Sequence, residues 1–298
     1  RGVRIAARLS VLSPLVLIAA VACFHRELRE AWWVFRLGSE DAKVRLEAAH
    51  ALLELPPTSR GFDALANALL HDSSSKEFEQ FVSGRSLLTQ RIAPRLPKRT
   101  TIQGILDQLA PYLRIRVSYL SAYPETVTLS DRDSLTLRDV LEAWRKSASG
   151  SHGFVLDTTK RELILGPEPE ILARAAASPL RSIDWRIGPI AQAVLDSSYT
   201  RQVLQRAFQS PEPRVRAQAA RLAGPAGPDL VPLLVEALTD PCTDLISARA
   251  LQHLGTSAKA ALVPLQEATR QTGKDETFVL EAGIAYSRIL RGPIKKRK

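Results

Sequence analysis

Cysteine is scarce in this sequence, and its scarcity excludes two classes of protein. The chain of 298 residues has two cysteines, Cys23 and Cys242, and Cys23 lies within an apolar segment. A disulfide framework needs several cysteines, and a structural zinc site needs four ligands that lie close together. The chain is therefore neither a disulfide-stapled domain nor a cysteine-based zinc protein.

Catalytic motifs are lacking as well. The five histidines are dispersed without a His-Glu-x-x-His pattern, and the chain has no Gly-x-Ser-x-Gly elbow and no P-loop. Asp131 and Asp133 are expected to be turn residues ahead of a helix that begins near Ser134. We therefore predict no catalytic residue, no cofactor-binding residue and no metal ligand, and we expect that the chain is not an enzyme.

Methionine is absent altogether, whereas arginine is abundant. Because the sequence starts with Arg1, we expect its N-terminus to be processed or trimmed. Arginine dominates the formal net charge of +10, but an arginine-rich composition also accompanies GC-rich coding, so the charge alone does not predict a nucleic-acid ligand. Hydrophobic residues make up 45% of the chain, which is enough to fill the cores of several modest domains.

A basic and then apolar segment opens the sequence. Arg1, Arg4 and Arg8 precede an apolar run over 9–24, which is about 16 residues long against the roughly 20 that a membrane-spanning helix needs. We predict a signal or membrane-anchor segment over 1–30. Its basic end would stay on the cytoplasmic side, and the rest of the chain would be exported.

Three interpretations of this segment stay open. It is an uncleaved anchor, a cleaved or lipidated signal, or a buried amphipathic helix of a soluble protein. Residues 20–22 have a small-x-small pattern ahead of Cys23, which resembles a weak bacterial lipobox. Trp32, Trp33 and Phe35 would then either form an aromatic belt at a membrane interface or pack against the first helical repeat.

Internal repetition is clearest in the C-terminal third. Leu-Val-Pro-Leu at 230–233 recurs at 262–265, a period of roughly 32 residues that is typical of a helix-turn-helix repeat. Proline is tolerated in the first turn of a helix, so each copy is predicted to open a short helix. We predict C-terminal repeats over 189–292, with a last helix from about Glu276 to Leu290, followed by a basic tail over 293–298.

The same plan recurs near the N-terminus, over 31–75. Residues 39–41 are expected to supply the cap and an acidic first turn of a helix whose apolar stripe includes Ala48 and Leu52, and a second helix with Phe62 follows. A single repeat cannot bury its apolar face. It must therefore pack on the segment around Trp32, on the middle of the chain, or on the C-terminal repeats.

The repeats resemble a known family. The Val44-Arg45 and Val215-Arg216 pairs, each followed by two alanines (48–49 and 219–220), and the Leu-Val-Pro-Leu openings are similar to HEAT repeats of the short kind also found in phycobilin-lyase-like proteins. The resemblance covers about half of the chain. It implies stacked helix pairs with a concave surface for protein partners, since only a few HEAT families add chemistry.

Between the repeats, residues 100–167 change periodicity and predict a small two-layer α/β domain. Helix, two strands, helix and two strands follow one another, ending in a hairpin that turns over 157–160. The phrases at 127–129, 135–141 and 163–165 resemble the short N-terminal domain of secretins and TonB-dependent receptors. That resemblance implies a periplasmic protein-contact module, although no secretin or barrel region follows it here.

Together these observations predict a mainly α fold: HEAT-like helical repeats, an inserted two-layer α/β domain and an N-terminal apolar helix. Residues 76–99 are expected to be a linker or a first strand of the insert, and 168–188 a second linker. The expected function is a membrane-anchored or exported protein-binding scaffold of a bacterial envelope. A HEAT-like lyase or glycosylase-type enzyme is one alternative. The other is a nucleic-acid-binding repeat protein that uses Arg45, Arg214, Arg216, Arg221 and Arg249.

Overall fold

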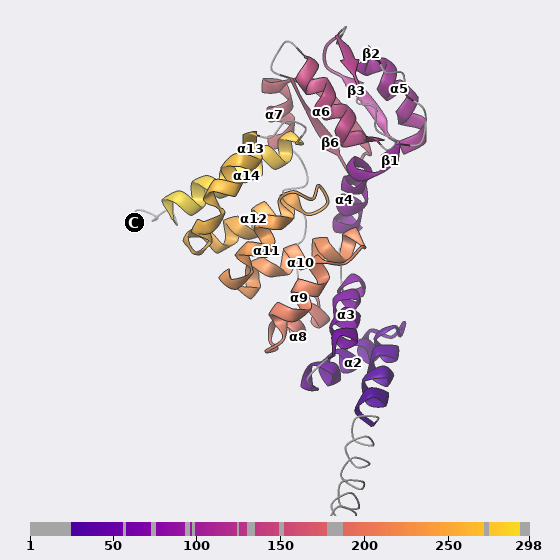
Figure 1. The fold of residues 1–298 in the computed structure, drawn as a ribbon, viewed down its shortest axis with the longest axis vertical. Helices are drawn as coiled ribbons and strands as arrows, with labels where there is room; N and C mark the ends of the chain where they lie inside the picture. Colours follow the sequence, from indigo (N-terminus) through magenta and orange to yellow (C-terminus); the bar gives the residue numbers. More distant parts are fainter. Residues whose placement is uncertain are drawn as a thin grey trace, which may run out of the picture.

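A computed structural model describes most of the chain. The described residues are 25–55, 58–72, 76–92, 96, 99–123, 125–129, 135–148, 152–177, 187–270 and 274–292. The apolar run 9–24, the tail 293–298, and Asp131 and Asp133 lie outside them. The described part is mainly helical with a few small sheets, which confirms the predicted class at this level (Figure 1).

Helices build both ends of the chain. Residues 25–37 are helical. The helices that follow them on the N-terminal side are α2 (Ala42–Glu54), α3 (Ser59–Ala68), η1 (Leu69–His71), α4 (Lys76–Ser86) and η2 (Leu87–Thr89). Those on the C-terminal side are α7 (Glu168–Ala176), α8 (Pro189–Leu195), α9 (Thr200–Phe208), α10 (Pro213–Ala226), η4 (Pro228–Leu230), α11 (Val231–Ala237), α12 (Asp244–Leu254), η5 (Gly255–Ala261), α13 (Leu262–Arg270) and α14 (Glu276–Arg291).

The N-terminal helices pack on the C-terminal ones, far away in sequence. Helix α2 contacts α8, and α3 contacts α9, where the rings of Phe62 and Tyr199 lie 5.8 Å apart. Buried side chains from 37–82 and from 190–289 belong to one continuous core. The N-terminal helix pair therefore buries its apolar face on the C-terminal helices, which is one of the three possibilities that the sequence left open.

Asp72 ties these two parts of the chain together. Its carboxylate accepts hydrogen bonds from the backbone N–H groups of Ile190 (3.0 Å) and Ala191 (2.6 Å), 118 and 119 residues away, in the first turn of α8. These N–H groups have no hydrogen-bond partner within their own helix, so the carboxylate supplies the missing acceptors. Its negative charge also interacts favourably with the positive end of the helix dipole. Gly188 leaves the space that this close approach of Asp72 requires.

A second core belongs to the strand-containing region between α4 and α7. Its helices are α5 (Ile102–Leu113) and α6 (Leu137–Ser147), and a threonine caps each of them, Thr101 and Thr136. Helix α6 begins at Leu137, later than expected, because Thr136 and Asp139 form a capping box. The strands are β1 (Arg91–Ile92), β2 (Arg99–Thr101), β3 (Arg116–Tyr119), β4 (Thr126–Thr128), β5 (Leu135–Thr136), β6 (His152–Asp157) and β7 (Glu162–Pro167).

The largest sheet is buried on both faces. Its order is β3-β7-β6, with β3 parallel and β6 antiparallel to β7. Phe154 and Leu163 face the core of the strand-containing region, whereas Val155 and Ile164 face α7 together with Leu280 of α14. Because side chains on both faces are covered, β6 and β7 have continuous apolar runs in place of alternation.

Two segments that the sequence suggests as linkers are partly helical. Residues 76–86 form α4, whose Phe78 and Phe81 join the helical core, and the two short strands β1 and β2 follow. Residues 168–176 form α7. Helix α4 packs on α10, so the helical array extends into the segment that the sequence suggests as a linker.

Candidate functional site

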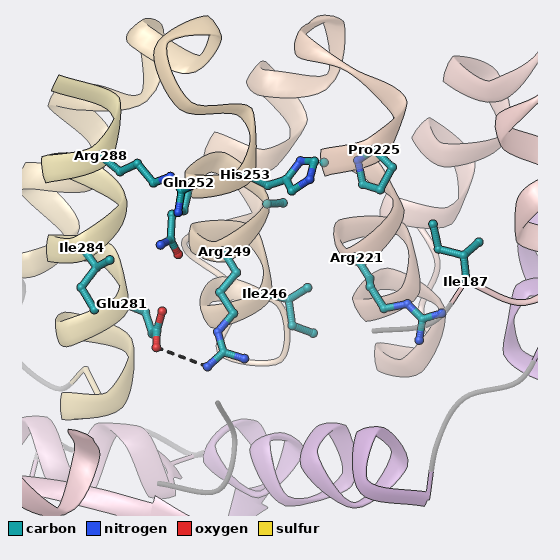
Figure 2. A pocket seen from close by; sticks show the side chains of 12 residues that line it. Ile187, Arg221, Pro225, Ile246, Arg249, Gln252, His253, Glu281, Ile284 and Arg288 are labelled. Carbon is teal, nitrogen blue, oxygen red and sulfur yellow. Dashed lines mark hydrogen bonds and ion pairs between the residues drawn. The ribbon is translucent and has the colours of Figure 1, made fainter. Parts of the chain in front are cut away.

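Helices α10, α12 and α14 lie next to one another in the C-terminal array and form its hollowed face. Gly224 of α10 lies against Ala250 of α12, where an added Cβ would be 3.4 Å from the Cα of Ala250. A cavity of about 690 Å³ opens along these three helices, and we call it the groove (Figure 2). The three helices position all of its charged side chains.

Arginine is the dominant charged residue of the groove. Arg221 comes from α10, Arg249 from α12 and Arg288 from α14. The Glu281 carboxylate lies 3.2 Å from the Arg249 guanidinium, and both side chains are largely buried. Arg221 is 6% exposed, with its guanidinium 5.3 Å from the ring centroid of Phe78 in α4. With His253 neutral, three arginines and one glutamate give the groove a formal charge of +2.

Apolar side chains line the groove between these charges. Ile246 of α12 and Ile284 of α14 lie on neighbouring helices, and Ile187 with Pro225 closes the α10 side (Figure 2). An apolar surface with a few fixed charged groups is typical of binding sites, because the apolar area supplies affinity and the charges supply orientation. The arrangement can hold a chain with apolar and anionic groups.

The other arginines that the sequence suggests for a basic groove lie elsewhere. Arg45 donates hydrogen bonds from Nη1 to the backbone carbonyls of Ser39 (2.8 Å) and Glu40 (2.7 Å). Arg216 bonds the equivalent pair, Ser210 and Pro211, at 2.9 and 3.0 Å. The recurrent Val-Arg pair therefore fastens the loop that precedes each helix. Arg214 is exposed outside the groove.

A second polar cluster joins the strand-containing region to the helical array, and we call it the junction. Its centre is Arg85 of α4, which is 1% exposed. Arg85 lies 2.6 Å from Asp244, 3.5 Å from Asp275 and 2.8 Å from the carbonyl oxygen of Pro241. Burial alone would lower the pKa of this guanidinium, but the carboxylates of Asp244 and Asp275 raise it.

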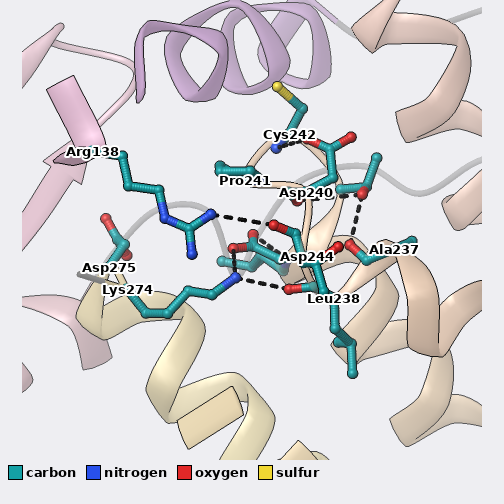
Figure 3. Close-up of polar contacts among 12 residues, drawn as sticks. Arg138, Ala237, Leu238, Asp240, Pro241, Cys242, Asp244, Lys274 and Asp275 are labelled. Carbon is teal, nitrogen blue, oxygen red and sulfur yellow. Dashed lines mark hydrogen bonds and ion pairs between the residues drawn. The ribbon is translucent and has the colours of Figure 1, made fainter. Parts of the chain in front are cut away.

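Lys274 completes the buried charges of the junction. Its ammonium group lies 3.4 Å from Asp244 and donates to the carbonyl oxygen of Leu238 at 2.8 Å (Figure 3). Burial lowers the pKa of Lys274, although Asp244 opposes the shift. Arg138 of α6 donates to the carbonyl of Thr239 in the same turn at 3.2 Å. The loop between α11 and α12 is therefore held from two sides.

Asp275 and Glu276 connect the junction to β6 and α6. Asp275 caps α14 through Thr277 N (2.8 Å) and accepts the backbone N–H of Leu156 at 2.9 Å. Glu276 lies 3.1 Å from Arg145 of α6. Burial raises the pKa of Glu276 to about 8, although Arg145 opposes the shift. These contacts fix the strand-containing region against the helical array.

Cysteine and histidine are the other side chains with reactive groups. Burial and the nearby Asp240 raise the pKa of Cys242 to about 11, so its thiol stays protonated at neutral pH and is a poor nucleophile. His50 and His253 are exposed, and His152 packs 5.2 Å from the ring of Tyr123. Among the described residues, no group of three or more histidine, cysteine or acidic side chains could hold a metal ion.

Sequence reasoning found two of the groove arginines, Arg221 and Arg249, but missed Arg288, His253 and Glu281. The repeat pattern could have suggested these three residues as candidates, because each lies on a helix that the sequence predicts. Which faces of those helices meet depends on their stacking, which the repeat period does not specify.

Comparison with family models, with curated proteins and with solved structures finds no match. Within the described residues, no helix is both long and apolar enough to cross a membrane. The functional interpretation therefore depends on the groove, the junction and the helix at 25–37.

Proposed function

We propose that the chain is a non-catalytic, protein-binding scaffold, and that the groove binds an acidic segment of a partner protein. The observation that carries the proposal is the groove itself, where the exposed Arg288 lies with Arg221 and Arg249 on three adjacent helices, beside the isoleucines of α12 and α14. Arginine binds carboxylates through paired hydrogen bonds and is enriched at the energetic centres of protein interfaces. A preformed groove also reduces the entropy lost on binding.

The finer architecture belongs to the same proposal. We take the paired, stacked helices as HEAT-like repeats and the strand-containing region as an inserted two-layer α/β domain of secretin N-terminal type. Support comes from the equivalent bonds of Arg45 and Arg216 and from the common core that both ends of the chain share. We further propose that the apolar run 9–24 attaches the scaffold to a bacterial envelope membrane, with the described residues on the extracytoplasmic side.

A random dodecapeptide library displayed on phage tests the binding proposal. The wild-type chain should enrich peptides that combine aspartate or glutamate with apolar residues. Arg288→Glu should lose this enrichment because it replaces an exposed groove cation by an anion. Arg270→Glu is the matched control, an exposed arginine of α13 outside the groove. Enrichment of peptides without acidic residues, or the same peptides with Arg288→Glu, would overturn the proposal.

A nucleic acid is the second candidate ligand, since the groove carries a formal charge of +2. Phosphate binding predicts affinity for a DNA duplex that falls steeply with salt. Glu281 opposes this alternative, because its carboxylate lies beside Arg249 in the groove. Salt-dependent retention of an oligonucleotide that Arg288→Glu abolishes, without peptide enrichment, would favour the nucleic acid over the protein partner.

A further inference from the structure

The helix at residues 25–37 has two unlike faces. One face packs on the helical core through Trp33, Val34 and Leu37. The opposite face carries Leu28, Trp32 and Phe35, which are 56%, 57% and 75% exposed. These three residues have i, i+4 and i+7 spacing, so they form a single stripe along the helix. We call this stripe the outer face.

The outer face is a continuous apolar surface. The rings of Trp32 and Phe35 lie 6.3 Å apart, and a hollow of about 330 Å³ lies between them and the start of α2, beside Gly38 and Val44. Clustered exposed aromatic residues with a hollow next to them are typical of an interaction surface that a partner or a membrane covers.

The sequence around this helix indicates what covers it. The apolar run 9–24 precedes this helix in the sequence, and only His25, Arg26 and Glu27 separate it from Leu28. Exposed Arg29 follows Leu28 in the helix. Tryptophan prefers the boundary between headgroups and acyl chains, and arginine near that boundary attracts anionic headgroups. This combination fits a lipid surface.

We infer that Leu28, Trp32 and Phe35 lie in the headgroup layer of a bilayer and dock the helical array on the membrane. The inference rests on the proposed attachment through 9–24 and adds a second contact with the bilayer. An amphipathic helix of this kind lies in the plane of the interface with its apolar face buried by lipid.

The attachment would be stiff, since the docked helix belongs to the folded array. The carboxylate of Glu30 on this helix accepts a hydrogen bond from the Thr58 hydroxyl at 2.6 Å, and Trp33 packs on the core. The helix at 25–37 lies at one end of the molecule and the strand-containing region at the other (Figure 1). Docking through the outer face therefore holds that region away from the membrane, at a fixed height.

Photo-crosslinking tests the inference on the full chain. Benzoylphenylalanine replaces Phe35 in one variant and Val263 in another, and each is reconstituted into vesicles of phosphatidylcholine and phosphatidylglycerol. Val263 is the matched control, because it is 62% exposed on α13 in the C-terminal array. We expect lipid adducts, identified by mass spectrometry, at position 35 and none at position 263.

Two results would overturn the inference, and they differ in what they say of the proposed attachment. If the chain sediments with the vesicles but position 35 gives no lipid adduct, or gives a crosslink to a second protein chain, the attachment stands and the docking fails. If the chain does not sediment with the vesicles at all, the attachment through 9–24 fails and docking fails with it.

Discussion

The junction and the groove use arginine in opposite environments. At the junction, Arg85 is 1% exposed and makes contacts with two carboxylates and a backbone carbonyl. In the groove, Arg288 is exposed at the surface of the cavity. The first guanidinium is committed to holding two parts of the chain together, whereas the second stands where a ligand can meet it.

The difference separates folding from recognition within one molecule. A buried ion pair has had its water removed, so removing one partner leaves an uncompensated charge at a high cost. An exposed arginine keeps its water, and its replacement changes stability little. The comparison therefore predicts a large stability effect at Arg85 of the junction and a small one at Arg288 of the groove.

Arg85→Met should give the largest loss. Methionine keeps much of the side-chain length but removes the cation closest to Asp244. Breaking a buried ion pair by removing one partner costs about 3–5 kcal/mol. Urea unfolding followed by circular dichroism measures the change in the free energy of unfolding. A loss below about 1 kcal/mol, the range of surface ion pairs, would contradict the distinction between the two regions.

Glu276→Gln should remove a pH dependence of stability that originates at the junction. Burial raises the pKa of Glu276 from 4.5 to about 8, so the folded chain holds this proton more tightly than the unfolded chain. Stability from this group is complete below about pH 4.5 and is lost as the pH rises through about 8. The thermal unfolding midpoint should therefore fall less over this range in the variant. Equal slopes would show that Glu276 ionises normally.

Asp72→Ala should have an intermediate effect. The variant removes the two hydrogen bonds that cap the first turn of α8, and loss of such a cap typically costs about 0.5–2 kcal/mol. Asp63→Ala is the matched control, since Asp63 is 57% exposed and its contact with Arg206 is 3.8 Å long. Chemical unfolding measures the change in the free energy of unfolding. An equal change in both variants would show that Asp72 does not stabilise the contact between the two ends of the array.

Arg288→Ala should change stability least, within about 0.5 kcal/mol of the wild type. The same variant should weaken the binding of a library-selected acidic peptide by about tenfold or more, because truncation of an interface arginine commonly costs over 1 kcal/mol. Fluorescence anisotropy of the labelled peptide measures the affinity. If neither the affinity nor the stability changes, Arg288 has no role in binding at the groove.

Local features of the fold were predictable from the sequence. The cap within 39–41 and the apolar stripe with Ala48 and Leu52 depend on neighbours within a few residues, and the structure confirms them, with Asp41 as the capping residue. The hairpin of β6 and β7 was also predicted, and Asp157 closes its turn by accepting the backbone N–H groups of Thr159 and Lys160.

Contacts between distant segments were not predictable in the same way. The packing of α3 on α9 and the bonds of Asp72 depend on how helices separated by more than a hundred residues stack. Strands β1 and β5 have two residues each, which is too short for an alternation to be recognised. Arg85 lies in a segment that the sequence suggests as a linker, and its place at the junction depends on Asp244, which is 159 residues away.

Arg45 and Arg216 show that part of the arginine content of this chain holds its own loops in place. Each guanidinium bridges two carbonyl oxygens ahead of its helix, and Arg85 fills a similar internal place. Part of the formal charge of +10 is thus directed at the protein's own backbone. A neutral carbonyl oxygen leaves each guanidinium its positive charge but holds it in place, so these arginines serve the fold, whereas the exposed Arg288 of the groove stays accessible to an approaching anion.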